Sequence, residues 1–415
     1  MSGQVLRGTG SVSGANLAWQ THENLVSAWR YVMTTPTKPS AFQPSRYVWK
    51  GPALSEARSL PANCYTSAAF FKAEVENIHA RGWIIVGRVD EWANPGQYSS
   101  IETVGGPVLI VRDDTGTLRA LANFCRHRGA LLLEGCGIAR MILCPYHAWS
   151  YRLNGAVLAA PSMEETEGFD KAEYGLLPIR LETWAGFVFI NYSNDAPSLK
   201  EDIGDLADLL ASHNMDDMVV TWRKDLEAKC NWKLLVENAM ESYHTGTVHA
   251  NTVGAQKSVS FSGVGEWMGM QVLSKSSIAV MNGDEPPFQP IQGLSDQAQQ
   301  GTFFMFLHPT TQFCCAQDCM WWLTVRPVAA DRTVLSIGGC FPRKTVERPT
   351  FEADAAPYYK RWESVAREDV GVLEKLQGAL HSRLFQPGPL SWRDDLVHTF
   401  DQWVMDRMPE AARKL

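Results

Sequence analysis

Two short segments, each with one cysteine and one histidine, constrain this chain more than any other feature of its sequence. One residue separates Cys125 from His127, two separate Cys144 from His147, and sixteen lie between the segments. Two thiolates and two imidazoles suit a tetrahedral zinc ion, or a two-iron cluster in which both thiolates bind one iron and both imidazoles the other. Structural zinc sites usually combine C-x2-C with H-x3-5-H pairs. One ligand of each kind per segment therefore favours the cluster, although the spacing alone does not exclude zinc.

The residues around these segments resemble a small β domain in their pattern. Short runs rich in β-branched and aromatic residues are separated by turn sequences such as 113–116 and 154–155. The predicted strands are Trp83–Val86, Val108–Val111, Leu118–Asn123 and Phe187–Tyr192. We expect residues 61–195 to form one mostly β domain whose loops carry the Cys/His segments. Residues 1–60 are predicted to be an N-terminal extension with a short helix around Leu17–Tyr31.

A second domain is predicted over residues 196–415, after a linker-like sequence at 194–197. The predicted helices are Leu199–His213, Trp232–His244, Ala356–Leu380 and Leu396–Met408. The predicted strands are Met218–Glu227, Phe303–Leu307, Met320–Val325 and Val334–Gly338, with a turn at 331–332 between the last two. Strands and helices that do not alternate strictly indicate an α+β fold.

A second group of ligand-type side chains follows about a hundred residues after the first. On the predicted helix, Glu237, Glu241 and His244 fall on one face, and a break at 246–247 would let His249 turn back toward them. Two imidazoles and one carboxylate form the facial triad of non-haem iron(II) oxygenases. Taken alone, the same residues are compatible with a zinc site or with a solvated polar face.

Taken together, the two groups resemble the catalytic α subunits of Rieske non-haem iron oxygenases. The resemblance rests on both Cys/His segments and on N-W-K…E-N…E-x-Y-H…H at 231–249. Respiratory Rieske proteins carry a further cysteine in each loop, where this chain has Ala130 and Tyr146. The resemblance implies a small all-β Rieske domain followed by a helix-grip (START-like) α+β catalytic domain with an antiparallel sheet.

The resemblance also implies the ligands of both metal centres. Cys125, His127, Cys144 and His147 would bind a [2Fe-2S] cluster, and His244 and His249 would bind a mononuclear Fe(II). The family takes its carboxylate ligand from a C-terminal helix in an E-D-V-x-x-x-E-x-x-Q context, which occurs here at 368–377. Asp369 is therefore the predicted ligand, ahead of Glu237 and Glu241, with Glu368 as its nearest rival.

Further residues are assigned roles by the same resemblance. Family members assemble as rings, usually trimers, in which an acid bridges one subunit's cluster histidine to its neighbour's iron ligand. That acid is Glu241 here, and its partner would be His147. A glutamate at this place is similar to branches that act on choline, carnitine, glycine betaine and stachydrine, although Ser242 and Ala250 depart from them. Asn238 could tune the iron site by hydrogen bonding.

The implied function is that of a terminal oxygenase which hydroxylates, or N-demethylates, a small organic substrate with dioxygen. The chain lacks a G-x-G-x-x-G turn and a plant-type ferredoxin motif, so an NAD(P)H-dependent flavin and iron–sulfur reductase would supply electrons. Aromatic residues at 303–306 and 321–322 could bind a quaternary ammonium group or form sheet core. Hydroxylation of an aromatic or heteroaromatic acid, a Rieske electron-transfer protein without oxygenase activity, and a zinc-stabilised binding protein are alternatives.

Bulk composition excludes other classes of function. A formal net charge of −7 over 415 residues argues against nucleic-acid binding. Nine cysteines, sparse and odd in number, argue against a disulfide framework. Neither a signal peptide nor an apolar run long enough to cross a bilayer is visible, so a cytoplasmic protein without membrane contact is expected.

Overall fold

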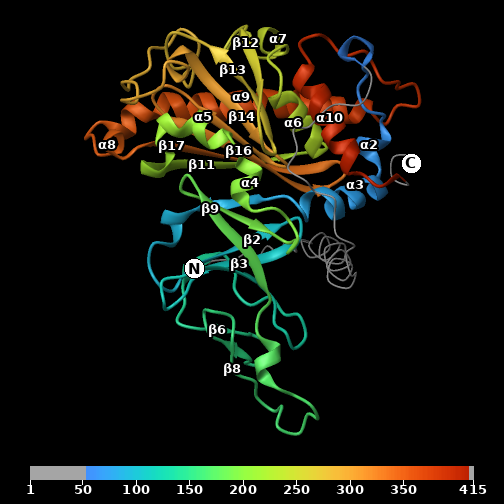
Figure 1. Cartoon of the computed structure of the whole chain (residues 1–415), viewed down its shortest axis with the longest axis vertical. Helices are drawn as coiled ribbons and strands as arrows, with labels where there is room; N and C mark the ends of the chain where they lie inside the picture. The colour runs from blue at the N-terminus through green and yellow to red at the C-terminus, as the bar shows by residue number, and fades with distance from the viewer. Residues whose placement is uncertain (1–52, 411–415) are drawn as a thin grey trace, which may run out of the picture. The chain divides into compact units, whose positions relative to one another are not determined.

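Residues 53–410 are described by a computed structural model, and residues 1–52 and 411–415 are not. The helix expected around Leu17–Tyr31 therefore lies outside the described residues. Over residues 53–410, the strands form two seven-stranded sheets and one three-stranded sheet, all with antiparallel pairing (Figure 1). No helix in this part of the chain is both long and apolar enough to cross a membrane.

The first seven-stranded sheet has the strand order β1-β10-β9-β4-β3-β2-β5, and the small sheet has the order β6-β7-β8. Their bounds are β1 Ile84–Arg88, β2 Gln97–Thr103, β3 Gly106–Arg112, β4 Leu118–Ala122, β5 Cys136–Ile138, β6 Ile142–Leu143, β7 Ser150–Tyr151, β8 Val157–Ala159, β9 Pro178–Trp184 and β10 Phe187–Asn191. The four strands predicted in this region are all present. The sequence did not predict the other strands, for two reasons. Some are very short, such as β5, and others, such as β2, are polar and only partly buried, so they lack a clear alternation of apolar and polar residues.

The second seven-stranded sheet has the order β11-β17-β16-β15-β14-β13-β12. Its strands are β11 Met218–Ala228, β12 Ser258–Ser262, β13 Trp267–Leu273, β14 Gly301–Leu307, β15 Thr311–Cys315, β16 Met320–Ala329 and β17 Arg332–Pro342. The four predicted strands are again present. Strands β13 and β15 were missed because almost every side chain in them is buried, which removes the apolar–polar alternation that marks a strand.

The helices are α2 Asn63–Thr66, α3 Ala68–Glu74, α4 Leu199–Ile203, α5 Leu206–Leu210, α6 Trp232–Ala239, α7 Thr245–Val248, α8 Arg343–Val346, α9 Phe351–Ala379 and α10 Asp395–Arg407. The prediction of one helix over 199–213 was wrong, because the chain turns at Gly204 (φ 51°) between α4 and α5. A Cβ atom at Gly204 would lie 1.7 Å from the carbonyl oxygen of Val264, so this close approach requires glycine. The two predicted C-terminal helices correspond to α9 and α10.

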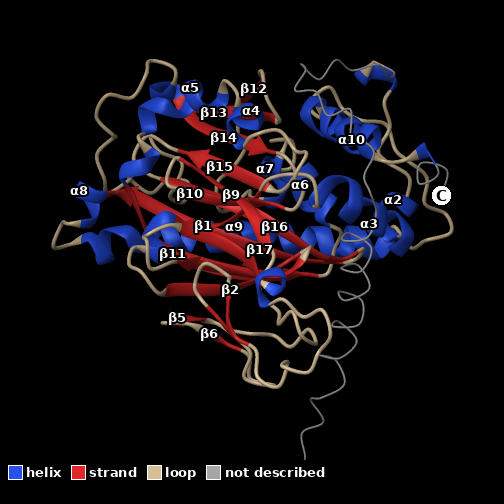
Figure 2. Cartoon of the chain, turned by 60° about the horizontal axis from the view of Figure 1, so that its bottom comes forward, coloured by secondary structure: helices blue, strands red, loops and turns tan. Residues whose placement is uncertain are grey.

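The second sheet is the middle layer of the molecule. Alternate side chains of β14 face opposite sides: Phe306 packs in the core shared with α6, α9 and α10, whereas Phe303 packs in the core shared with β1 and β10 of the first sheet. Figure 2 shows helices α2, α3, α6 and α10 gathered at one edge, and α10 contacts both α6 and the turn after α3. Buried Arg88 ties the two sheets together by donating to the carbonyls of Met215 and Met218 at 2.9 and 3.0 Å.

Candidate metal centres and the cavity beside them

The two Cys/His loops share one backbone hydrogen-bond pattern. In each loop the cysteine N–H donates to the carbonyl five residues on, from Cys125 to Ala130 at 2.8 Å and from Cys144 to Trp149 at 2.7 Å. The carbonyl of each cysteine accepts from the N–H four residues on, at 2.9 and 3.2 Å. Two loops of the same shape therefore present their cysteines in equivalent positions, although the histidine is one residue further along in the second.

The four side chains of these loops divide into a buried pair and an exposed pair. Cys125 and Cys144 are 2% and 3% exposed, and burial raises the pKa of the Cys125 thiol. His127 and His147 are exposed, with ring centroids 4.8 Å apart, and His127 stacks on the buried ring of Trp149 at 5.3 Å. A buried pair of thiols and an exposed pair of imidazoles fit a cluster in which the thiolates bind one iron and the imidazoles bind the other. The structure thus places the two predicted histidine ligands beside each other and the two predicted cysteine ligands beside each other.

Sequence reasoning missed Tyr151, whose hydroxyl lies 3.2 Å from the sulfur of Cys125. The same hydroxyl accepts a hydrogen bond from the backbone N–H of Arg126 at 3.0 Å, so its own proton is available to the sulfur. A tyrosine seven residues after Cys144, within the small sheet, could have been noticed, but nothing local in the sequence indicates its contact with the other loop.

The helix that was expected to carry the second group ends earlier than predicted. Helix α6 stops at Ala239, so the prediction that Glu241 and His244 lie on its face was wrong. The carboxylate of Glu241 accepts hydrogen bonds from the backbone N–H groups of Tyr243 and His244, and these replace helical bonds and start a new turn. The break expected at 246–247 was also wrong, because these residues belong to α7.

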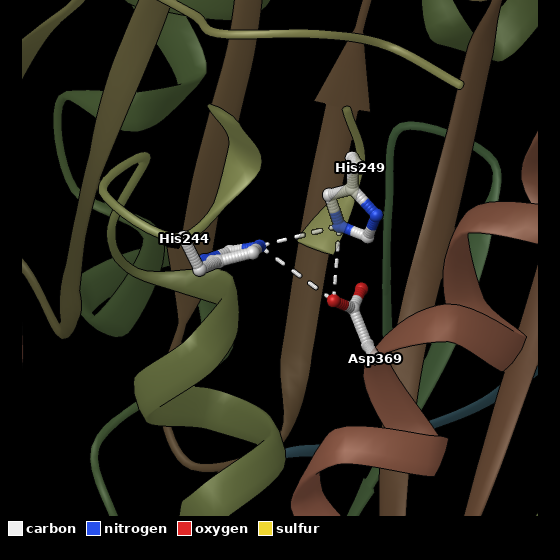
Figure 3. Close-up of side chains that lie close together, drawn as sticks. All are labelled: His244, His249 and Asp369. Atoms are coloured by element: carbon white, nitrogen blue, oxygen red, sulfur yellow. Dashed lines mark hydrogen bonds and ion pairs between the residues drawn. The ribbon is translucent and has the colours of Figure 1, made fainter. Parts of the chain in front are cut away.

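His244, His249 and Asp369 nevertheless converge on one point (Figure 3). The Nε2 atoms of the histidines are 3.3 Å apart, and the Oδ1 atom of Asp369 lies 3.6 Å from His244 Nε2 and 3.0 Å from His249 Nε2. Ligands bound to one metal ion at about 2.1 Å, at right angles to one another, lie about 3 Å apart. Asp369 Oδ1 is shielded from solvent and makes no hydrogen bond of good geometry. The donor set and its spacing fit a divalent iron ion.

The outer nitrogen of each histidine ring is held by a glutamate. Nδ1 of His244 lies 2.5 Å from Glu241, and Nδ1 of His249 lies 2.7 Å from Glu368, which also accepts a hydrogen bond from Thr252. These contacts place the ring proton on Nδ1 and leave Nε2 free to bind a metal. Burial acts to lower the pKa of His249, but Asp369 and Glu368 outweigh it and raise that pKa. Glu368, considered in the sequence only as a rival ligand, thus contacts the ring rather than the metal position.

Glu237, another candidate carboxylate, lies away from this point. It accepts a hydrogen bond from the Tyr65 hydroxyl at 2.8 Å, and burial raises its pKa to about 7. Asp401 of α10 is its acidic neighbour, and burial followed by the charge of Glu237 raises the pKa of Asp401 well above its usual range. Glu237 therefore belongs to a buried polar cluster between α6 and α10.

A cavity of about 100 Å³ adjoins the three converging side chains. At roughly 10–15 Å³ for each water-sized volume, it has room for on the order of ten non-hydrogen atoms. Its wall is mostly apolar and aromatic, and its polar members include Asn238, Glu241 and Arg361. Of the aromatic runs noted in the sequence, Phe304, Phe306 and Trp321 line this cavity, whereas Phe303 and Trp322 pack on the opposite face of the sheet.

Within the described residues, Glu241 and His147 make no contact with each other. His147 lies in the loop between β6 and β7 of the small sheet. Figure 1 shows β6 and β8 of this sheet at the opposite end of the drawn unit from α6 and α7, with both large sheets between them. Glu241 therefore cannot bridge to the His147 of its own chain in this arrangement.

Two family models match separate parts of the chain. Residues 82–175 match the Rieske [2Fe-2S] domain, and residues 215–410 match the catalytic domain of the ring-hydroxylating alpha subunit. A Rieske domain implies a [2Fe-2S] cluster, and the ring-hydroxylating catalytic domain binds a mononuclear iron.

Individual relatives are monooxygenases or their oxygenase subunits. The carnitine monooxygenase oxygenase subunit of Escherichia coli K12 is 39% identical over 197 residues, which cover 47% of this chain and 53% of that protein. The glycine betaine monooxygenase oxygenase subunit of Chromohalobacter salexigens is 25% identical over 84% of this chain and 86% of its own length. The chloroplastic choline monooxygenase of Beta vulgaris is 32% identical over 47% of this chain and 45% of its own length. The match thus spans only about half the length of the carnitine and choline relatives.

The fold agrees with a solved structure over most of the chain. A quaternary ammonium Rieske monooxygenase, described for carnitine oxidation and inter-subunit electron transfer, superposes with a TM-score of 0.74 at 27% identity. The superposition covers 86% of this chain and 97% of that one. Two matching domains in the same order, together with this agreement, lead to one assignment: the chain belongs to the Rieske oxygenase α subunits.

Proposed function

We propose that this chain is the terminal oxygenase of a system that uses dioxygen and reductase-derived electrons to hydroxylate a small organic substrate. The observation that carries the proposal is that His244, His249 and Asp369 converge at the wall of a cavity. A facial triad leaves coordination positions open, and here a substrate-sized space adjoins them. A protein that only transferred electrons would have no use for this cavity.

In this proposal, iron held by the triad supplies the binding and activation of dioxygen, and the cluster supplies the electrons. Glu241 and Glu368 orient the two imidazoles through Nδ1, so that both Nε2 atoms face the metal. The apolar wall excludes bulk water from the reacting carbon. Asn238 lies in the same wall, where its amide can hydrogen-bond close to the metal.

The electrons would pass between subunits of a ring, which we propose to be a homotrimer. His147 is exposed in the single chain, which is required of a histidine that contacts a neighbouring subunit. The carboxylate of Glu241 has about four acceptor positions. Three are used by the N–H groups of Tyr243 and His244 and by the His244 ring. The remaining position can accept a hydrogen bond from His147 of a neighbour. A reductase with flavin and iron–sulfur groups would reduce the cluster from NAD(P)H.

We propose a betaine-type quaternary ammonium compound as the substrate. The relatives that act on carnitine, glycine betaine and choline support this class. Hydroxylation consumes one dioxygen, two electrons and two protons, and it releases one water. If the hydroxyl is placed on a carbon next to nitrogen, the product breaks down to an aldehyde and the demethylated amine. Ring hydroxylation of an aromatic acid is the competing reaction, and its product would be a phenol or a cis-diol.

Product analysis tests the function. The iron-loaded protein would be supplied with a surrogate reductase, NADH, and a panel of betaines and aromatic acids, and products would be identified by mass spectrometry. We expect hydroxylated or demethylated product from the wild type and none from His244→Ala or His249→Ala, while the paramagnetic resonance signal of the reduced cluster persists. His381→Ala, which removes an exposed histidine after α9, is the matched control.

Two results would contradict the proposal. A protein that binds zinc and shows no cluster signal after reduction would be a zinc-stabilised binding protein. A protein whose cluster is intact but which binds no third iron per chain would be an electron-transfer protein.

A further inference from the structure

Arg361 places a buried cation in the wall of the cavity, eight residues before Asp369 on helix α9. The residue is 4% exposed, and its Nε atom is buried without a hydrogen-bond partner. Within residues 53–410, none of its nitrogen atoms forms an ion pair or a hydrogen bond with a protein group. Arginine is rarely buried without a partner, because its charge must then be removed from water without compensation.

The groups around Arg361 do not neutralise it. Its guanidinium lies over the ring of Trp321, 4.9 Å from the centroid, which orients the group but brings no negative charge. The nearby thiols of Cys314 and Cys319 have pKa values raised well above the usual range, chiefly by burial, so both are neutral. Asp369 acts on Arg361 only from beyond ion-pair distance, and its Oδ1 atom faces the two histidines.

Arg361 and the three residues of the metal position line the same cavity. Eight residues of α-helix rise about 12 Å along the axis. Trp362, Val365 and Ala366 of the same helix line the cavity between Arg361 and Asp369. The cavity is thus lined both by a site for a divalent metal and by an unpaired cation, and apolar or aromatic residues of the same helix lie between them in sequence.

We propose that Arg361 binds the carboxylate of the substrate and thereby selects zwitterionic, carboxylate-bearing compounds over cationic ones without an acid group. The planar guanidinium can bind a carboxylate through two parallel hydrogen bonds. A bound carboxylate would provide the missing counter-charge and would hold the opposite end of a small molecule toward the metal. This inference rests on the proposed function and adds to it, because the relatives include enzymes named for carnitine and glycine betaine, which carry a carboxylate, and for choline, which does not.

Direct binding tests the inference without turnover. Glycine betaine and choline share a trimethylammonium group and differ mainly in a carboxylate against a hydroxymethyl group, so they form a matched pair. Dissociation constants would be measured by calorimetric titration of the unaltered, metal-loaded protein. Whichever of glycine betaine and carnitine binds more tightly should have a dissociation constant at least roughly tenfold lower than that of choline. This comparison requires no variant and so does not depend on whether a variant folds.

Variants then assign the effect to Arg361. Arg361→Met keeps the length of the side chain and removes its charge, and should weaken carboxylate binding by roughly 10–100-fold while leaving choline binding unchanged or improved. Arg361→Lys keeps the charge but loses the planar guanidinium, and its affinity for the carboxylates should lie between those of the wild type and Arg361→Met. Arg367→Met, which removes an exposed arginine of the same helix, is the control and should bind as the wild type does. Iron content and the cluster signal should be the same in all four proteins.

The outcomes separate this inference from the proposed function. If the carboxylates bind through Arg361 but no panel compound is hydroxylated, the inference stands and the oxygenase function fails. If choline binds as tightly as the carboxylates, if no carboxylate in the panel binds, or if Arg361→Met binds the carboxylates unchanged, the inference is overturned. In each of these three cases the oxygenase function would still hold, provided that the protein forms product from a panel compound.

Discussion

Glu368 and Asp369, adjacent in the sequence, contact opposite nitrogen atoms of the same imidazole. Glu368 lies 2.7 Å from Nδ1 of His249, and Asp369 lies 3.0 Å from its Nε2. One carboxylate therefore orients the ring while the other completes the donor set at the metal position. Two acids that look interchangeable in the sequence have different roles in the structure.

Substitutions of these two acids should have different consequences. Asp369→Ala removes the proposed carboxylate ligand of the iron, so we expect it to abolish iron binding and product formation. Glu368→Gln retains a hydrogen-bonding group beside His249, so iron should still bind, with an affinity lower by roughly 10–100-fold. Iron titration of the metal-free proteins measures both effects, with Glu363→Gln of the same helix as the control. Equal loss of iron in the Asp369 and Glu368 variants would show that the roles are not distinct.

Glu241 should matter for electron transfer more than for metal binding. Glu241→Ala removes the contact with His244 and the proposed contact with His147 of a neighbour. We expect oxidation of the reduced cluster by dioxygen, in the presence of substrate, to slow by roughly 10–100-fold while cluster content stays the same. Stopped-flow absorbance of the pre-reduced protein measures this rate. Glu241→Asp is the comparison, and an unchanged rate in Glu241→Ala would argue against the bridge.

Tyr151 should tune the cluster. Donation of a hydrogen bond to the sulfur of Cys125 stabilises the reduced, more negative cluster. Tyr151→Phe should therefore lower the reduction potential, on the order of 60 mV for a hydrogen bond of about 1.4 kcal/mol. Protein-film voltammetry measures the shift. Tyr174→Phe changes a tyrosine of the same domain that contacts Trp149, Phe169 and Arg126 instead of a cluster cysteine, and should leave the potential unchanged. A Tyr151→Phe potential equal to that of the wild type would rule out the contact.

The buried acids Glu237 and Asp401 should make stability depend on pH. Both have raised pKa values in the folded protein, chiefly because of burial, so the folded state holds protons that the unfolded chain releases above about pH 4.5. Their contribution to stability is therefore present below that pH and is lost as pH rises through about 7. Asp401→Asn, which cannot ionise, should make the decline of the melting temperature between pH 5.5 and 8.5 shallower by a few degrees. A parallel decline in both proteins would show that other groups cause it.

The strands that the sequence predicted are those in which local patterning is strong. The runs at Phe187–Tyr192 and Met218–Glu227 combine β-branched and aromatic residues with clear turn signals, and both are strands in the structure. Fully buried β13 and β15 have no alternation to detect. The end of α6 was missed because it depends on a side chain: Glu241 competes for backbone N–H groups that would otherwise continue the helix.

The candidate metal ligands could be predicted from the sequence itself, because the spacing of Cys125, His127, Cys144 and His147, together with the later histidines, resembles a specific chemistry. Tertiary structure alone decided which residues support those ligands. Glu368 reaches His249 across 119 positions of sequence, and Tyr151 reaches Cys125 from strand β7 of the small sheet. The burial of Arg361 without a partner also arises only when α9 packs over the second sheet. Ligand spacing is a local property of the chain, whereas burial and counter-charge depend on what the fold places nearby.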